Sequence, residues 1–151
     1  MDWLLSTDMV LAQSVMGTDD TLSILGAGWS AMEASSLPVR HPRLGVGVIL
    51  TLGPNAPAGR HAVDLRLQNA YGMQLDLGQA PEGPKPPNFG RVNVDLFVEP
   101  IPEGLDVPLR RVCLAFNFDG LVLREYGLHE MMLAVDGMDV RSIGFVVRRP
   151  I

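Results

Sequence analysis

Cysteine and long apolar runs are scarce in this sequence. Cys113 is the single cysteine, so no disulfide can form within the chain, which is typical of proteins in a reducing compartment. No run of about 18 apolar residues is present, which argues against a membrane span. Met1-Asp2-Trp3 also lacks the basic residues that open a secretion signal. These absences predict a cytoplasmic protein.

Positive charge is scarce as well. The chain has 12 Lys and Arg against 17 Asp and Glu, for a net charge of −5, and Lys85 is its single lysine. A protein that binds nucleic acid needs clustered basic side chains to neutralise phosphates. The charge balance therefore predicts no nucleic-acid partner.

The apolar content, 47% of the 151 positions, is ordinary for a globular domain. A chain of this length can bury enough surface for one self-supporting core. Residues 1–151 are therefore predicted to form a single domain.

The clearest structural pattern lies at the C-terminal end. His129, Met131, Leu133 and Val135 alternate with the period of two that a strand imposes. Asp136-Gly137 then suits a type I′ turn, and the apolar stretch around Val140 and 145–147 follows it. This segment predicts a β-hairpin that closes a sheet.

Similar alternation recurs along the chain, with turn signals spaced roughly 8–12 residues apart. It is found at 43–52, 61–68, 91–99 and 110–118, with a shorter return strand at 73–77. The pattern predicts an all-β fold, an antiparallel β-sandwich of immunoglobulin-like or jelly-roll type with eight or nine strands.

The segments between these strands are less regular. Residues 9–16 fit either a strand or a short helix capped by Ser6-Thr7-Asp8 and, with 22–31, resemble an opening hairpin. Ser35–Pro42 is predicted to be a loop because prolines are disfavoured inside sheets. Asp119-Gly120 is predicted to turn the chain, and 79–90 to form a proline-rich loop.

The strand at 43–52 has one unusual face. Leu44, Val46 and Val48 begin an apolar face, whereas the other face carries Gly45, Gly47, Ile49 and Thr51. Two interpretations fit these glycines: a close approach by another segment, or positions of bulge and twist.

No motif identifies an enzyme or a cofactor site. Gly26-Ala27-Gly28-Trp29-Ser30-Ala31 fits the glycine pattern of a dinucleotide-binding turn, but Pro38 leaves room for only a short helix after it. The acidic residue expected about 20 positions later is missing. The prediction is therefore that no cofactor binds and that no residue is catalytic.

Metal ligation has equally little support. The three histidines, His41, His61 and His129, are far apart in sequence. Asp136 and Asp139 flank a turn without EF-hand spacing, so no metal site is predicted, although a calcium site carried by loops stays open.

Two stretches carry a family resemblance. Val10-Leu11-Ala12 followed by residues 22–29, and the closing Leu133-Ala134-Val135-Asp136-Gly137, are similar to a small actinobacterial β-sandwich family of unknown function. The shared features are an N-terminal ILGxGW hairpin and a C-terminal VDG hairpin. The resemblance implies a compact β-sandwich and assigns no catalytic or binding residue.

The function predicted from these observations is a non-catalytic binding or assembly module that self-associates. The apolar or small second faces at Trp29, Gly45, Gly47 and Ile49 are the predicted interface, because exposing them together would create a large apolar patch. Two alternatives remain: a small-molecule-binding or enzymatic sandwich with its site in the loops, and a structural component of a phage or phage-like particle.

Overall fold

A computed structural model of the chain describes residues 1–18, 20–77 and 90–151. These residues form eleven strands and no helix, so the all-β prediction is confirmed with more strands than the eight or nine expected. The strands are β1 (Leu4–Ala12), β2 (Ser14–Gly17), β3 (Leu22–Leu25), β4 (Ala31–Glu33), β5 (Val39–Leu52), β6 (Gly59–Asn69), β7 (Gln74–Leu75), β8 (Arg91–Val98), β9 (Arg110–Leu123), β10 (Gly127–Val135) and β11 (Met138–Arg148).

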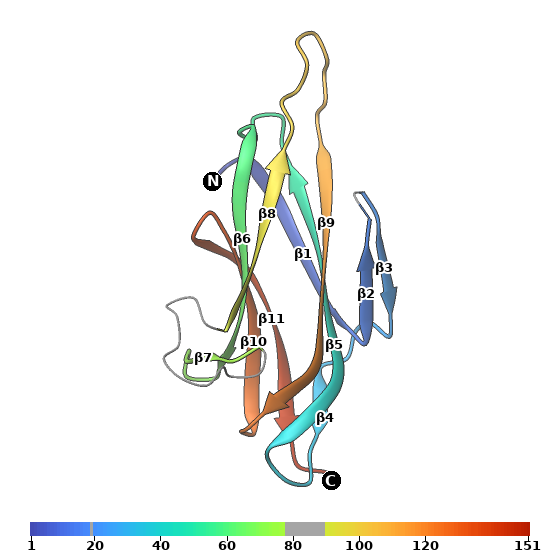
Figure 1. Cartoon of the computed structure of the whole chain (residues 1–151), viewed down its shortest axis with the longest axis vertical. Coiled ribbons are helices and arrows are strands. Elements are labelled where there is room, and N and C mark those ends of the chain that lie inside the picture. The colour runs from blue at the N-terminus through green and yellow to red at the C-terminus, as the bar shows by residue number, and fades with distance from the viewer. Residues whose placement is uncertain (19, 78–89) are drawn as a thin grey trace.

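The strands are arranged in three sheets (Figure 1). A three-stranded sheet has the order β1-β5-β9, and a six-stranded sheet has the order β4-β11-β10-β6-β7 with β8 also paired to β6. The third sheet is the two-stranded β2-β3 hairpin, which stands to one side of β5 and β9. Pairing is antiparallel except between β4 and β11, which run parallel.

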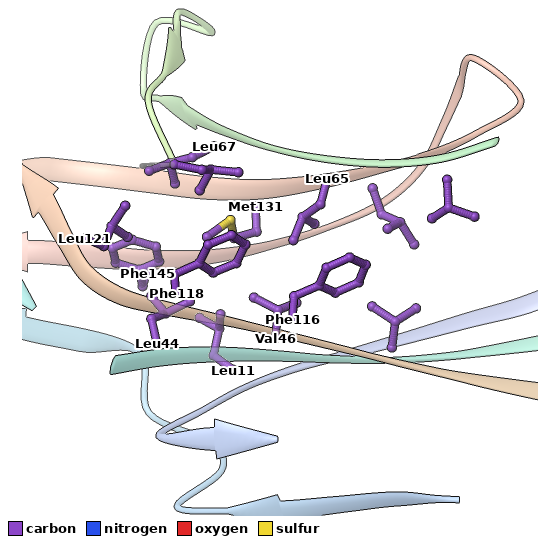
Figure 2. Close-up of a cluster of buried hydrophobic side chains, with 14 of the residues drawn as sticks. Leu11, Leu44, Val46, Leu65, Leu67, Phe116, Phe118, Leu121, Met131 and Phe145 are labelled. Atoms are coloured by element: carbon purple, nitrogen blue, oxygen red, sulfur yellow. The ribbon is translucent and has the colours of Figure 1, made fainter. Parts of the chain in front are cut away.

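One hydrophobic core lies between the two larger sheets (Figure 2). The alternating side chains Leu44 and Val46 of β5, with Phe116 of β9, face Leu65 of β6 and Met131 of β10. Because successive strand residues point to opposite faces, each of these strands contributes every second residue to this core. The immunoglobulin-like or jelly-roll type of this arrangement stays a prediction.

The C-terminal hairpin forms as the sequence predicts. β10 and β11 pair from Gly127–Val147 to Val135–Met138. Asp136 and Gly137 both have positive φ, 49° and 80°, as a type I′ turn requires.

β5 and β9 are longer than expected, and two sequence predictions about them are wrong. β5 begins at Val39 and passes through Pro42, although Ser35–Pro42 was expected to be a loop. β1 ends opposite Gly45, so Pro42 has no neighbouring strand on that side that would need its missing N–H. Asp119-Gly120 does not turn the chain, because β9 continues to Leu123 along this extension of β5.

Residues 9–16 are strand on both sides of Gln13, not helix. Residues 9–12 complete β1, and β2 begins at Ser14. The opening hairpin joins β2 to β3, and its turn is closed by the Thr18 N–H, which donates to the Thr21 carbonyl at 2.9 Å. The predicted proline-rich loop at 79–90 lies, except for Gly90, outside the described residues.

Candidate functional site

The glycine face of β5 is covered by the chain's own β2-β3 hairpin. A Cβ on Gly45 would lie 3.1 Å from the Val15 nitrogen and 3.2 Å from the Ser14 carbonyl carbon. A Cβ on Gly47 would lie 2.8 Å from Leu22 Cδ2. The glycines therefore permit a close approach between two layers of backbone, the first of the two interpretations offered by the sequence.

A side chain from β9 fastens the hairpin to this face. Asn117 Nδ2 donates to the Val15 carbonyl at 2.8 Å, and the Val15 N–H donates to Asn117 Oδ1 at 3.0 Å. The amide thus bonds both polar groups of one peptide residue, as a neighbouring strand would. Arg43 Nη1 adds a longer bond of 3.4 Å to the Ser14 hydroxyl.

The hairpin has one covered side and one open side. Val15 is buried and Leu22 lies against Gly47, so these two residues mark the side that faces β5. Met16 and Leu25 belong to the alternate positions and are 66% and 67% exposed. The side that faces away from β5 therefore presents two large apolar side chains to solvent.

The four predicted interface residues are separated by this arrangement. Gly45 and Gly47 are buried beneath the hairpin, whereas Ile49, further along the same face, is half-buried. Trp29 is also half-buried, with its ring 5.4 Å from that of Phe145 and 5.6 Å from that of His41. An interface role for these residues stays a prediction. Gly45 and Gly47 could contribute to an interface only indirectly, by allowing the hairpin to pack closely on β5.

Residues 26–30 link the two larger sheets through backbone hydrogen bonds. The Gly28 N–H donates to the Leu11 carbonyl of β1, and the Val146 N–H of β11 donates to the Ser30 carbonyl, each at 2.9 Å. Gly26 and Gly28 have positive φ, and the segment leads into β4 instead of a helix. A helix N-terminus that could hold a pyrophosphate is therefore missing at this turn.

The three histidines occupy separate environments. His41 lies against Trp29, and desolvation lowers its pKa. His129 is fully buried and stacked on Phe145, and its Nδ1 lies 3.0 Å from the Gly127 carbonyl. Within the described ranges no three side chains of His, Cys, Asp or Glu gather as a metal site would require.

His61 is the histidine that contacts a carboxylate. Its Nδ1 lies 2.7 Å from Asp136 Oδ2 and its Nε2 lies 2.7 Å from the Pro57 carbonyl oxygen. The hydrogen bond to Asp136 is the main cause that raises the pKa of His61. Asp139, the other carboxylate at this turn, accepts two hydrogen bonds from Arg66 at 2.7 and 2.8 Å.

Two open hollows lie at strand ends. One of about 240 Å³ is bordered by Leu4, Thr7 and Arg141, and another of about 300 Å³ by Phe97, Val98 and Arg110. Both are at or below the lower limit for small-molecule sites, which are usually roughly 300–1,000 Å³.

Sequence reasoning missed two residues that matter here. Asn117 follows an apolar strand residue and has no signature that would reveal its partner 102 positions away. The sequence presents His61 only as a possible metal ligand, and a separation of 75 positions from Asp136 gives no sign of their contact. The glycines at 45 and 47 were the one available signal.

These observations define an all-β protein with two facing sheets and a hairpin packed outside them. The chain belongs to a family of unknown function (DUF6941), whose model matches residues 7–148. The predicted membership in a family of unknown function is thus confirmed, while the actinobacterial origin and the specific hairpin motifs stay predictions.

No curated protein matches the chain closely. Among solved structures, it is similar to the Pseudomonas fluorescens alkylpurine DNA glycosylase AlkC bound to DNA containing an abasic site analog. The TM-score is 0.40 and the identity 11%, over 93% of this chain and 30% of that one. This likeness carries no argument about function. No helix that could cross a membrane occurs in the part of the chain that the structure describes.

Proposed function

We propose that this chain is a non-catalytic assembly module that self-associates through the outward side of the β2-β3 hairpin. The observation that carries the proposal is the exposure of Met16 and Leu25, about two thirds each, on that side. We further propose that the two facing sheets form the sandwich scaffold that holds the hairpin in place.

The apolar second face of β5 supports this role. No charged residue lies on this face between Gly45 and Thr51. The face is therefore expected to be covered by another part of the protein instead of being exposed to water. The hairpin supplies that cover at Gly45 and Gly47 and places its own apolar residues outward instead. Exposed apolar side chains that gather on one element are typical of protein–protein contacts.

A second copy of the chain is the proposed partner. Met16, Ser23 and Leu25 occupy outward positions of the hairpin, and none of them is charged. Two copies that each carry a net charge of −5 can therefore approach here without direct repulsion between side chains.

Light scattering on a size-exclusion column at tens of micromolar tests the proposal. We expect a mass above that of one chain, and the mass of a monomer for the double variant Met16→Ser with Leu25→Ser. Met73→Ser is the matched control, because Met73 is 64% exposed but lies beside β7. A monomeric natural chain, or dissociation by the control variant as well, would overturn the proposal.

A further inference from the structure

Three segments that are distant in sequence converge on His61. The ring lies 4.8 Å from that of Trp3, near the N-terminus, and contacts Pro57 in the loop between β5 and β6. Its other nitrogen contacts Asp136 in the turn between β10 and β11. His61 itself is only 7% exposed, so water cannot readily replace these contacts.

The two oxygens that face the ring determine its protonation. The Pro57 carbonyl oxygen can only accept a hydrogen bond, and so can an ionised Asp136 carboxylate. Each oxygen lies 2.7 Å from a ring nitrogen, so both nitrogens must donate. A neutral imidazole has one N–H and would leave a lone pair facing one of the oxygens.

We propose that His61 is a pH-sensitive latch, which as an imidazolium ties the loop at 53–58 to the β10-β11 turn and releases one of these ties when it loses a proton. Two backbone N–H groups add hydrogen bonds to the same group of segments. The Gly53 N–H donates to the Trp3 carbonyl at 2.7 Å, and the Ala62 N–H donates to Asp136 Oδ1 at 3.0 Å. The N-terminal segment and the loop therefore share one attachment point.

Among the residues that the structure describes, few other charges reach this site. On β8 the residue opposite His61 is Leu96, and the neighbouring Arg60 and Asp95 lie on the other face of the sheet, where they pair at 3.6 Å. Asp2, which precedes Trp3, is exposed. Asp136 is thus the charged group in direct contact with the ring.

The direction of the switch follows from this charge. The hydrogen bond to Asp136 raises the pKa of His61, and desolvation opposes that rise. The ring therefore keeps its second proton, and the latch stays closed, up to a pH above the ordinary value of about 6.5, and the latch opens as the pH rises through the raised pKa. Histidine is suited to this task because its ordinary pKa lies at about 6.5.

Two spectroscopic measurements test the latch. Side-chain ¹⁵N spectra of the whole chain follow the two ring nitrogens of His61 directly, and we expect both to carry protons until the pH exceeds about 6.5. The second measurement is the fluorescence of Trp3 in a Trp29→Phe background. An imidazolium quenches an adjacent indole, so the emission should rise as His61 deprotonates.

Asp136→Asn is the matched variant. The amide can still accept from the Ala62 N–H, and it can donate to a neutral His61 Nδ1 while Nε2 donates to Pro57. Asparagine also tolerates positive φ. This variant should therefore keep the latch closed with a neutral ring and move the titration below that of the natural chain.

The outcomes separate the latch from a merely structural histidine. A midpoint above about 6.5 that falls in Asp136→Asn supports the proposal. A ring that is neutral at pH 6, or a midpoint unaffected by Asp136→Asn, overturns it. The ¹⁵N measurement needs no change at Trp29, so it decides the question even if the Trp29→Phe background folds poorly.

Discussion

At the scale of single residues, Gly45 and Gly47 differ in what lies above them. The space over Gly45 is bounded by the backbone of Ser14 and Val15, whereas that over Gly47 is bounded by the side-chain ends of Leu22 and Val10. Side-chain ends can move by changing rotamer, but a backbone fixed by hydrogen bonds cannot yield as easily. Gly45 and Gly47 therefore share one face of β5 but differ in how easily a larger side chain could be accommodated there.

We expect Gly45→Ala to lower the free energy of unfolding more than Gly47→Ala does. Overpacking typically costs about 1–3 kcal/mol, and Gly45→Ala should lie at the upper end of this range. Gly144→Ala is the control, because its nearest contact is the movable Leu128 Cδ1 at 3.3 Å. Urea unfolding measures all three variants. A smaller loss in Gly45→Ala than in Gly47→Ala would show that the hairpin is not fixed in place.

At the scale of elements, the β2-β3 hairpin depends on Asn117. We expect Asn117→Ala to cost about 1–3 kcal/mol of stability, since it leaves the buried Val15 N–H and carbonyl without partners. The hairpin should then open locally while the larger sheets stay intact. Hydrogen exchange would show faster exchange at Val15 with little change in β6 and β10.

Asn117→Asp is the informative companion variant. Its carboxylate can accept from the Val15 N–H but cannot donate to the Val15 carbonyl, and it places negative charge beside that oxygen. We therefore expect it to loosen the hairpin as well. Slow exchange at Val15 in both variants would mean that the hairpin is held by Val15 and Leu22 packing alone.

In the molecule as a whole, two ionic contacts at one turn limit the stability of the fold, one as the pH falls into the acid range and the other as the pH rises above about 6.5. The raised pKa of His61 stabilises the fold below about 6.5, and this contribution is lost as the pH rises through the folded-state value. The hydrogen bonds from Arg66 lower the pKa of Asp139. Its contribution is present above about 3.9 and is lost as the pH falls through the folded-state value.

We expect the melting temperature to be highest between about pH 4 and 6.5 and to decline on both sides. Asp136→Asn should flatten the decline on the alkaline side, and Asp139→Asn should reduce that on the acid side. The second effect should be small, below about 1 kcal/mol, because Asp139 is half exposed. Calorimetry from pH 3 to 9 measures both, and an alkaline decline unchanged by Asp136→Asn would contradict the assignment to His61.

Local sequence patterns are enough to place most strands and the side of each that faces the core. The alternation at 61–68 and 91–99 became β6 and β8, and Asp136-Gly137 became the turn of the closing hairpin. These features follow from local rules, because a strand's period of two and the positive φ of a tight turn are expressed within a few residues.

The ends of the long strands and the cover over their second faces depend instead on long-range packing. β9 runs past Asp119-Gly120 because the extension of β5, which includes Pro42, pairs with it. The contacts between Asn117 and Val15, and between His61 and Asp136, join residues separated by 102 and 75 positions. Such pairs depend on the packing of whole sheets, and nothing in the local sequence around either partner encodes the identity of the other.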